Sequence, residues 1–297
     1  MFKSHSIIIA ALLSSALPYP VVADEPPRVL VIGAHPDDAE SAAGLAAHYA
    51  AIGSEIMLIS LTNGDAGHHE IGGRPLALRR AEEARRSGQI IGAPYVLLDN
   101  HDGELSPNWE LRKRLIQMMR RFQPDVIITH RTNDYHPDHR YAGVLVRDAY
   151  TELSVAGNVA LTPYLKKFPV LLYMSDNFER PYPFTPDIAV DISGQLDTKI
   201  DMTHCHVSQM YEWLPYIRGQ IDQVPESDAD RRVWLAESIR AEARSTADKY
   251  RDVLIELYGA ERGKAIEFAE AYEISEYTLH LSEEKLRALF PFVYSRP

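Results

Sequence analysis

The chain has 297 residues, of which 45% are hydrophobic and 25% charged, with a formal net charge of −11 and a single cysteine, Cys205. This composition is that of a globular protein and excludes a disordered or repetitive chain. The acidic balance argues against a nucleic acid or an anionic membrane as partner, and one cysteine excludes an internal disulfide.

The N-terminal segment is predicted to be a secretory signal peptide. Residues 1–23 hold one lysine, a short apolar core (IIIAALLSSAL) and the run VVA directly before Asp24. The core is too short to span a bilayer as a helix of the mature protein, and its length favours a cleaved signal over an uncleaved anchor. We therefore expect an exported protein, periplasmic or extracellular, whose mature chain has no membrane span.

Apolar runs then alternate with amphipathic segments. Strands are predicted at 28–35, 55–64, 94–100, 125–131, 169–176 and 187–193, and helices at 38–52, 76–92, 109–122 and 138–150. Unbroken apolar strands in a strand-then-helix order predict an α/β fold, a Rossmann-like and mostly parallel sheet covered by helices on both faces. From residue 195 the pattern is helical, with helices predicted at 197–217 and 230–259. Because no linker interrupts the pattern, residues 24–297 are expected to form a single domain.

Polar residues gather where the predicted strands end. His35-Pro36-Asp37-Asp38 follows the first strand, TNGDAGHH (62–69) follows the second, and His130 leads into NDYHPDH (133–139) after the fourth. In a parallel sheet the carboxyl ends of the strands lie at one edge, where ligands bind. These segments are therefore expected to meet.

A metal site accounts for this clustering. Catalytic zinc takes three protein ligands from His, Asp or Glu and leaves one position for water. His35 and Asp38 lie three residues apart across a turn, and His136 or His139 can supply a third ligand. Asp37 then remains free to take a proton from the water. The alternative is that Asp37 or Asp38 caps the following helix, but the second His-Pro-Asp cluster favours the metal.

A dinucleotide site at the first strand is disfavoured. It requires G-x-G-x-x-G directly after the strand, whereas only Gly33 is present there and the next glycine is Gly44. The sequence has no Walker A loop either. These absences argue against NAD or FAD as the cofactor.

Two motifs resemble a known family. AHPDD (34–38) and HPDH (136–139) resemble the PIG-L (LmbE-like) deacetylases, in which a single zinc ion serves to hydrolyse the N-acetyl group of an amino sugar. Further segments that resemble the family are LTNGDAG (61–67), LRRAEEARRSGQIIGA (78–93), PDVIITHRTNDYHPDHR (124–140), KIDMTHCHVSQ (199–209) and AEAYE (269–273). In this order and spacing, they cover nearly the whole mature chain.

The resemblance implies a role for each motif residue. His35, Asp38 and His139 are implied as the ligands of one zinc ion, although this donor set also suits iron or cobalt. Asp37 is implied as the general base that activates water. His136 is implied to stabilise the developing oxyanion and to help protonate the leaving amine.

Further implied roles concern the surroundings of the motifs. Asp138 is implied to orient His136, and Arg80, Asp102 and His206 are implied to bind substrate. Some sugar deacetylases of the family carry a tyrosine two residues before the second motif. Asp134 stands at that position here, and we expect the difference to affect which sugar or aglycone is accepted.

The function implied is that of an exported, zinc-dependent N-deacetylase acting on an N-acetylglucosamine-type sugar or its conjugate. A homo-oligomer is compatible with the resemblance, because the family often forms symmetric assemblies. One alternative is an amidase on a larger sugar conjugate, and another is a non-catalytic carbohydrate-binding protein on the same fold. The intact Asp37 and His136 argue against binding alone, which needs neither a base nor an oxyanion group. A phosphoesterase would require a second metal.

Overall fold

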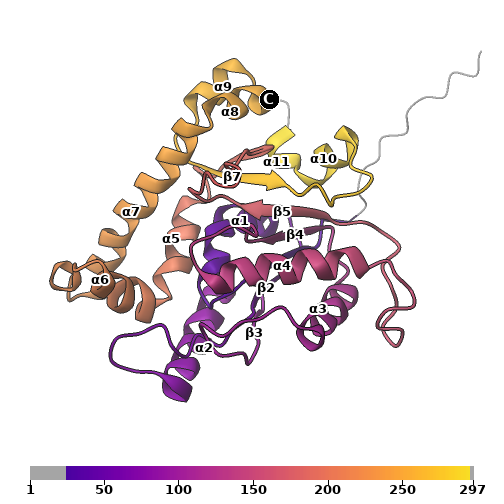
Figure 1. Cartoon of the computed structure of the whole chain (residues 1–297). Helices are drawn as coiled ribbons and strands as arrows, with labels where there is room; N and C mark the ends of the chain where they lie inside the picture. Colours follow the sequence, from indigo (N-terminus) through magenta and orange to yellow (C-terminus); the bar gives the residue numbers. More distant parts are fainter. Residues whose placement is uncertain (1–24, 295–297) are drawn as a thin grey trace, which may run out of the picture.

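Seven strands form one sheet in the computed structural model, which describes residues 25–294 (Figure 1). The strands are β1 (Val29–Gly33), β2 (Ile56–Ser60), β3 (Tyr95–Leu97), β4 (Val126–Thr129), β5 (Val170–Met174), β6 (Ile188–Asp191) and β7 (Ala269–Ile274), in the spatial order β3-β2-β1-β4-β5-β7-β6. The strands β1 to β5 are parallel, and β7 is antiparallel to both of its neighbours. The predicted α/β fold with a mostly parallel sheet is confirmed. The predicted signal peptide lies outside the described residues.

The strand β7 adds an element that was not predicted to the helical C-terminal part. Its sequence, AEAYEI, contains one β-branched residue, so local propensity does not identify a strand there. Pairing with β5 on one side and β6 on the other decides its conformation. Its buried Glu270 accepts hydrogen bonds from the backbone N–H groups of Gly44 and Leu45 and from Lys199 Nζ, which compensates the burial of its charge.

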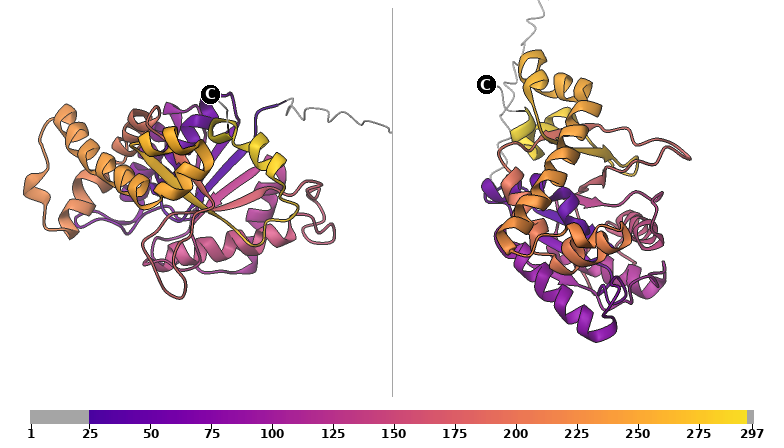
Figure 2. Two further views of the ribbon diagram at one scale, coloured as in Figure 1. Left: turned by 90° about the horizontal axis from the view of Figure 1, so that it is seen from above. Right: turned by 90° about the vertical axis from the view of Figure 1, so that its left-hand side faces the viewer.

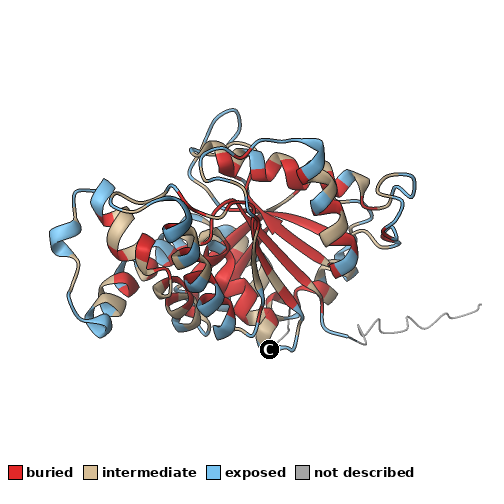
Figure 3. Ribbon diagram, turned by 90° about the horizontal axis from the view of Figure 1, so that it is seen from below, coloured by how far each residue is buried: buried red, intermediate tan, exposed pale blue. Residues whose placement is uncertain are grey.

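Helices cover both faces of the sheet (Figures 1 and 3). One core holds residues of α1 (Ala43–Ala51), α5 (Leu196–His204) and α7 (Asp228–Lys249), and a second core holds residues of α3 (Trp109–Phe122) and α4 (Pro137–Glu152). Side chains of β1 alternate between these cores: Val29 and Val31 enter the first, and Leu30 and Ile32 the second. The helix α2 (Gly73–Ile90) packs beside α5 and β3.

The predicted C-terminal helices are divided into shorter ones. After α5, a π-helical segment, η2 (Ser208–Trp213), leads into α6 (Leu214–Ile217), and a 3₁₀ turn, η3 (Ile221–Gln223), follows. The helix α7 runs along one edge of the molecule to α8 (Arg251–Tyr258) and α9 (Ala260–Ala265) (Figure 2). The chain then passes through β7 to α10 (Glu283–Leu289) and α11 (Pro291–Tyr294). Within residues 25–294, no helix combines the length and apolar character needed to cross a membrane.

Candidate metal centre

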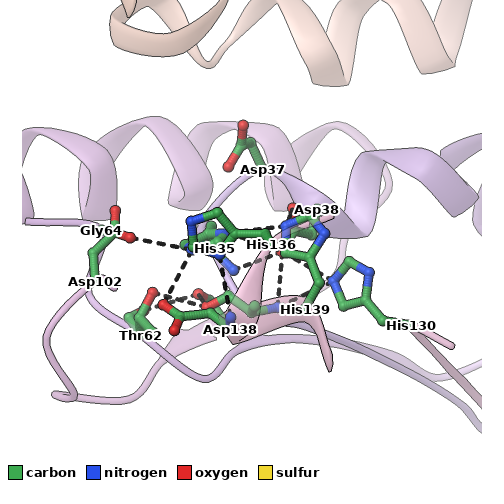
Figure 4. A network of polar contacts seen from close by, with 12 residues as sticks. His35, Asp37, Asp38, Thr62, Gly64, Asp102, His130, His136, Asp138 and His139 are labelled. Atoms are coloured by element: carbon green, nitrogen blue, oxygen red, sulfur yellow. Dashed lines mark hydrogen bonds and ion pairs between the residues drawn. The ribbon is translucent and has the colours of Figure 1, made fainter. Parts of the chain in front are cut away.

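The predicted site segments meet at the carboxyl edge of the sheet (Figure 4). The turn from His35 to Asp38 directly follows β1 and leads into a 3₁₀ segment, η1 (Asp38–Ala42). His130 directly follows β4, which lies beside β1 in the sheet. The helix α4 begins beside them, with His136 as its N-cap residue and His139 in its first turn. Topology therefore brings together residues that lie about a hundred positions apart.

Three side chains converge on one point: His35, Asp38 and His139. His35 Nδ1 lies 3.1 Å from His139 Nε2, and His139 Nε2 lies 3.3 Å from Asp38 Oδ1. His35 Nδ1 lies 3.5 Å from Asp38 Oδ2. Zinc bonds of about 2.0–2.2 Å in a tetrahedron separate neighbouring ligand atoms by about 3.3–3.6 Å. Although the distances run to both oxygens of Asp38, the spacing and chemistry of this donor set suit a single zinc-sized ion.

Other groupings at the same place also bring potential ligand atoms within 4.8 Å of one another: His35 with His136 and His139, Asp38 with His130 and His139, and His35 with Asp102 and Asp138. All three groups overlap the first set in at least one residue. The described cluster therefore has more histidine nitrogens and carboxylate oxygens than one tetrahedral ion requires. The remaining groups are available to orient the ligands or to act on substrate.

Asp38 is held by the end of β1. Its Oδ2 accepts hydrogen bonds from the backbone N–H groups of Ala34 at 2.8 Å and His35 at 2.7 Å, and lies 3.0 Å from His130 Nε2. Gly33 is required here, because a Cβ at that position would lie 2.5 Å from the Cβ of Asp38. The helix-cap alternative is wrong for both acids: Asp37 is the N-cap residue of η1 but its side chain makes no capping hydrogen bond, and Asp38 turns back towards the strand.

The electrostatics of the cluster favour a cation. Burial lowers the pKa of His139, but Asp38 and Asp134 outweigh burial and raise it to about 10. Burial likewise opposes the charged form of His35, yet Asp38, Asp102 and Asp138 raise its pKa well above the usual value. Burial would raise the pKa of Asp38, but the neighbouring histidines hold it well below its usual range. A site that stabilises extra protons on its imidazoles is equally suited to a divalent ion that replaces them.

Each candidate histidine ligand has a carboxylate at its other ring nitrogen. His139 Nδ1 lies 3.1 Å from Asp134 Oδ1, and His35 Nε2 lies 3.1 Å from Asp102 Oδ1. Such carboxylate–histidine pairs orient metal ligands and increase their basicity. Neither the orienting role of Asp134 nor the contact of His130 with Asp38 was predicted from the sequence. The signal for His130 was its position directly after a strand; Asp134 had no signal beyond its place two residues before His136.

Asp138 corrects a role that the resemblance implies. Its carboxylate accepts hydrogen bonds from the backbone N–H groups of Gly103 at 2.7 Å and Leu105 at 3.2 Å, and lies 3.4 Å from His35 Nε2. Only its backbone N–H reaches His136, donating to Nδ1 at 3.2 Å. The start of α4 thus turns the Asp138 side chain towards residues 103–105. The side chain of Asp138 therefore lies beside His35 rather than His136.

His136 is held in a defined state by these neighbours. Because its Nδ1 accepts the N–H of Asp138, the neutral ring carries its proton on Nε2. Burial lowers the pKa of His136, and the nearby His35 and His139 lower it further. The neutral imidazole is therefore the favoured form at neutral pH, with Nε2–H as a donor.

Arg80 joins Asp37 to Asp102. Its buried guanidinium donates from Nη2 to Asp37 Oδ1 at 2.6 Å, and its Nη1 lies 3.5 Å from Asp102 Oδ2. A cavity of about 400 Å³ opens beside the three residues and the metal cluster. Its remaining walls come from segments that were distant in the sequence, including Gly67, Tyr135, Gln209, Trp213, Leu214 and Ile217.

His206 does not reach this cavity, contrary to the role that the resemblance implies. It is fully buried, and its Nε2 lies 2.8 Å from Glu40 Oε1. The Ser87 hydroxyl donates to the same carboxylate, and Tyr95 lies within hydrogen-bond distance of it. The break between α5 and η2 carries His206 into the interior, where it stabilises Glu40 instead of contacting substrate.

Comparison with known proteins finds a family model and relatives that are similar to this chain. Residues 30–150 match the family model described as PIG-L: GlcNAc-PI de-N-acetylase. Diacetylchitobiose deacetylase from Thermococcus kodakarensis is 31% identical over 207 residues, which cover 64% of this chain and 75% of that protein.

Two solved structures share the fold. The N,N'-diacetylchitobiose deacetylase from Pyrococcus horikoshii has a TM-score of 0.63 and 22% identity, with 84% of each chain covered. The 4-carboxy-2-hydroxymuconate hydratase from Pseudomonas putida KT2440 has a TM-score of 0.66 and 22% identity, with 86% of this chain and all of that chain covered. The fold is therefore used by enzymes with different reactions, and the site residues must decide between them.

Proposed function

Because this chain belongs to the PIG-L family, we propose that it is a metal-dependent hydrolase that removes the acetyl group from an N-acetylglucosamine-type sugar or its conjugate. The observation that carries the proposal is the convergence of His35, Asp38 and His139 at the wall of a cavity that Asp37 and His136 also line. This arrangement places a base and a hydrogen-bond donor beside one metal position.

The three converging residues would hold the ion. Zinc bound there would supply a Lewis acid that polarises the acetamide carbonyl and acidifies water. The residues around it would act on the water, the developing charge and the leaving nitrogen.

Asp37 is suited to act as the base. Its Oδ1 is held by Arg80 at 2.6 Å, and among the described residues Oδ2 has no hydrogen-bond partner. Oδ2 is thus available to take a proton from the attacking water. The same proton can then pass from Asp37 to the leaving nitrogen, so that acetate and a free amine are released with no net proton taken up by Asp37.

His136 is suited to stabilise the oxyanion. The neutral ring with its proton on Nε2 offers a donor towards the cavity, and such a donor contributes most where charge develops in the transition state. Its lowered pKa favours this role over that of the acid that protonates the amine.

The charge of the cavity argues against the hydratase reaction. The hydratase that shares this fold is named after a substrate that carries a carboxylate group. Among the residues that line this cavity, Arg80 is the one Lys or Arg side chain, and Asp37 and Asp102 already occupy it. A neutral acetamido sugar needs no free cation and therefore fits better.

Acetate release tests the proposal. The purified protein would be assayed on N-acetylglucosamine, N,N'-diacetylchitobiose and larger N-acetylated saccharides, with zinc and after removal of metal by a chelator. Zinc-dependent release is expected. Asp37→Asn should reduce turnover by about 10²–10⁴-fold, as for loss of a general base, while elemental analysis finds the same zinc content.

Asp252→Asn provides the matched control, because this exposed acid lies on α8, away from the cavity. It should leave activity unchanged. No acetate from any saccharide by a zinc-loaded protein, or full activity in Asp37→Asn, would overturn the proposal.

Export remains a proposal of its own, supported by the apolar run and the VVA site before Asp24. N-terminal sequencing of protein from the expressing cell and its medium tests it. A mature N-terminus at Asp24 is expected, and an intact Met1 would contradict it.

A further inference from the structure

A second cavity adjoins the candidate active site. It has a volume of about 410 Å³, and Asp37 and Leu214 line both cavities. The second cavity lies between α5, α7 and the η2–α6 segment, which stand together at one end of the molecule (Figure 1). The two cavities therefore meet at Asp37, and a substrate bound at the metal cluster would reach the second cavity past this residue.

The walls of the second cavity suit a pyranose ring. The half-buried Trp234 of α7 lines the cavity with its indole, which also packs beside Tyr211, and Ser238 lies one turn further along the same helix. Gln220 and Gln223 contribute amides from the segment around η3. An aromatic ring can cover the C–H face of a sugar while amides and hydroxyls exchange hydrogen bonds with its ring hydroxyls.

The charges of the cavity select among sugars. Lys199 is already neutralised, because its Nζ lies 2.6 Å from Glu270 Oε1 and donates to two backbone carbonyl oxygens of η1 at 3.0 Å. Arg218 is the other positively charged residue of the lining, and Glu237 and Glu242 are negatively charged. Within the described chain neither glutamate has an ion-pair partner. An excess of negative charge repels a phosphate or a carboxylate and attracts an ammonium group.

We propose that this second cavity is a subsite for a neutral or cationic pyranose linked to the N-acetylated sugar. It makes the enzyme prefer a disaccharide or longer saccharide over a monosaccharide, and it disfavours anionic aglycones. This inference rests on the proposed deacetylase function and adds the part of the substrate that the metal cluster does not touch.

Kinetics on matched substrates test the subsite. The ratio of kcat/KM for N,N'-diacetylchitobiose to that for N-acetylglucosamine is expected to exceed one in the wild type. Trp234→Ala should lower this ratio by about tenfold, chiefly through KM on the disaccharide, as for loss of a stacked aromatic contact. Trp109→Ala, on α3 and outside both cavities, should leave the ratio unchanged.

A charge reversal tests the selectivity for uncharged over anionic sugars and leaves the indole of Trp234 in place. Glu237→Lys at an exposed position of α7 should raise kcat/KM for N-acetylglucosamine linked to glucuronic acid relative to the chitobiose substrate. Glu256→Lys, which replaces another exposed glutamate, on α8, is the control and should not change kcat/KM for either substrate. An unchanged selectivity in Glu237→Lys, together with an unchanged ratio in Trp234→Ala, would overturn the subsite.

A binding measurement tests the subsite independently of the proposed deacetylase reaction. Chitobiose without acetyl groups is expected to bind the wild type in calorimetry and to bind Glu237→Lys more weakly. Equal binding to both proteins would contradict the subsite. Failure of acetate release would instead count against the deacetylase proposal.

Discussion

At the scale of single residues, His139 has a carboxylate at each ring nitrogen, Asp38 at Nε2 and Asp134 at Nδ1. The outer carboxylate holds the ring in the orientation that directs Nε2 to the metal position. Asp134→Ala is therefore expected to weaken zinc affinity by about 10–100-fold, measured by competition with a chelator. Asp134→Asn should lose less, because its amide oxygen still accepts the Nδ1 proton.

The same measurement on Asp252→Asn controls for loss of a surface acid. Wild-type zinc affinity in Asp134→Ala would show that Asp134 does not orient the ligand.

The lone cysteine is predicted to be unreactive. Burial raises the pKa of Cys205 from 9.0 to about 11, and its thiol donates to the Asp201 carbonyl oxygen at 3.4 Å. Because the folded pKa is raised, the thiolate fraction near pH 8 should be about a hundredfold below that of an ordinary cysteine. A chromogenic disulfide reagent should react slowly with the native protein and rapidly after denaturation. Similar rates in both states would contradict the prediction.

At the scale of elements, α4 carries Asp138 and His139, has His136 as its N-cap residue, and packs tightly on the exit of β4. A Cβ at Gly143 would lie 2.7 Å from the carbonyl oxygen of His130 and 2.8 Å from that of Arg131. Gly143 lies one turn after His139. The close approach of Gly143 to the backbone of His130 therefore also sets the distance between His130 and His139. Small residues at such contacts are required because backbone atoms cannot move aside independently.

Gly143→Ala is expected to destabilise the fold and to weaken the metal site. Overpacking costs about 1–3 kcal/mol, which exceeds the gain of about 1 kcal/mol from replacing glycine in a helix. Denaturant unfolding measures the first effect and chelator competition the second. Gly157→Ala, where a Cβ would meet no atom within 4 Å, is the matched control. Equal stability and zinc affinity of Gly143→Ala and wild type would contradict this account of α4.

At the scale of the whole molecule, the candidate metal centre links distant parts of the chain. His35 and His139 lie 104 residues apart and belong to the β1 exit and to α4. An ion that binds the folded site more tightly than the unfolded chain stabilises the fold by about 2.7 kcal/mol at a hundred times its Kd. For a chain of this size each kcal/mol corresponds to about 2–4 °C.

Removal of metal should therefore lower Tm by about 5–10 °C, and added zinc should restore it. Calorimetry with and without chelator measures the change, with elemental analysis to establish that the ion has left. The same Tm for loaded and stripped protein would show that the cluster does not hold a stabilising ion.

The sequence was sufficient for the parallel part of the sheet and for the meeting of the two His-Pro-Asp motifs. Continuous apolar runs identify buried strands from local composition alone. In a parallel sheet, the residues after β1 and β4 share one edge, and the observed pairing of these two strands brings His35 and His130 together. The excess of carboxylates at that edge could be predicted as well, because these residues directly follow the predicted strands.

Only the tertiary structure decided what surrounds this cluster. The strand β7 has a weak local preference and exists because β5 and β6 pair with it. Asp138 finds its partner where residues 103–105 pack against it. His206 finds its partner, Glu40, in the interior of the fold. The ion pair of Arg80 with Asp37 likewise joins α2 to the β1 exit. The spacing of apolar residues and the preferences of turn residues are local properties of a sequence. These contacts instead depend on how distant segments of the chain pack against one another.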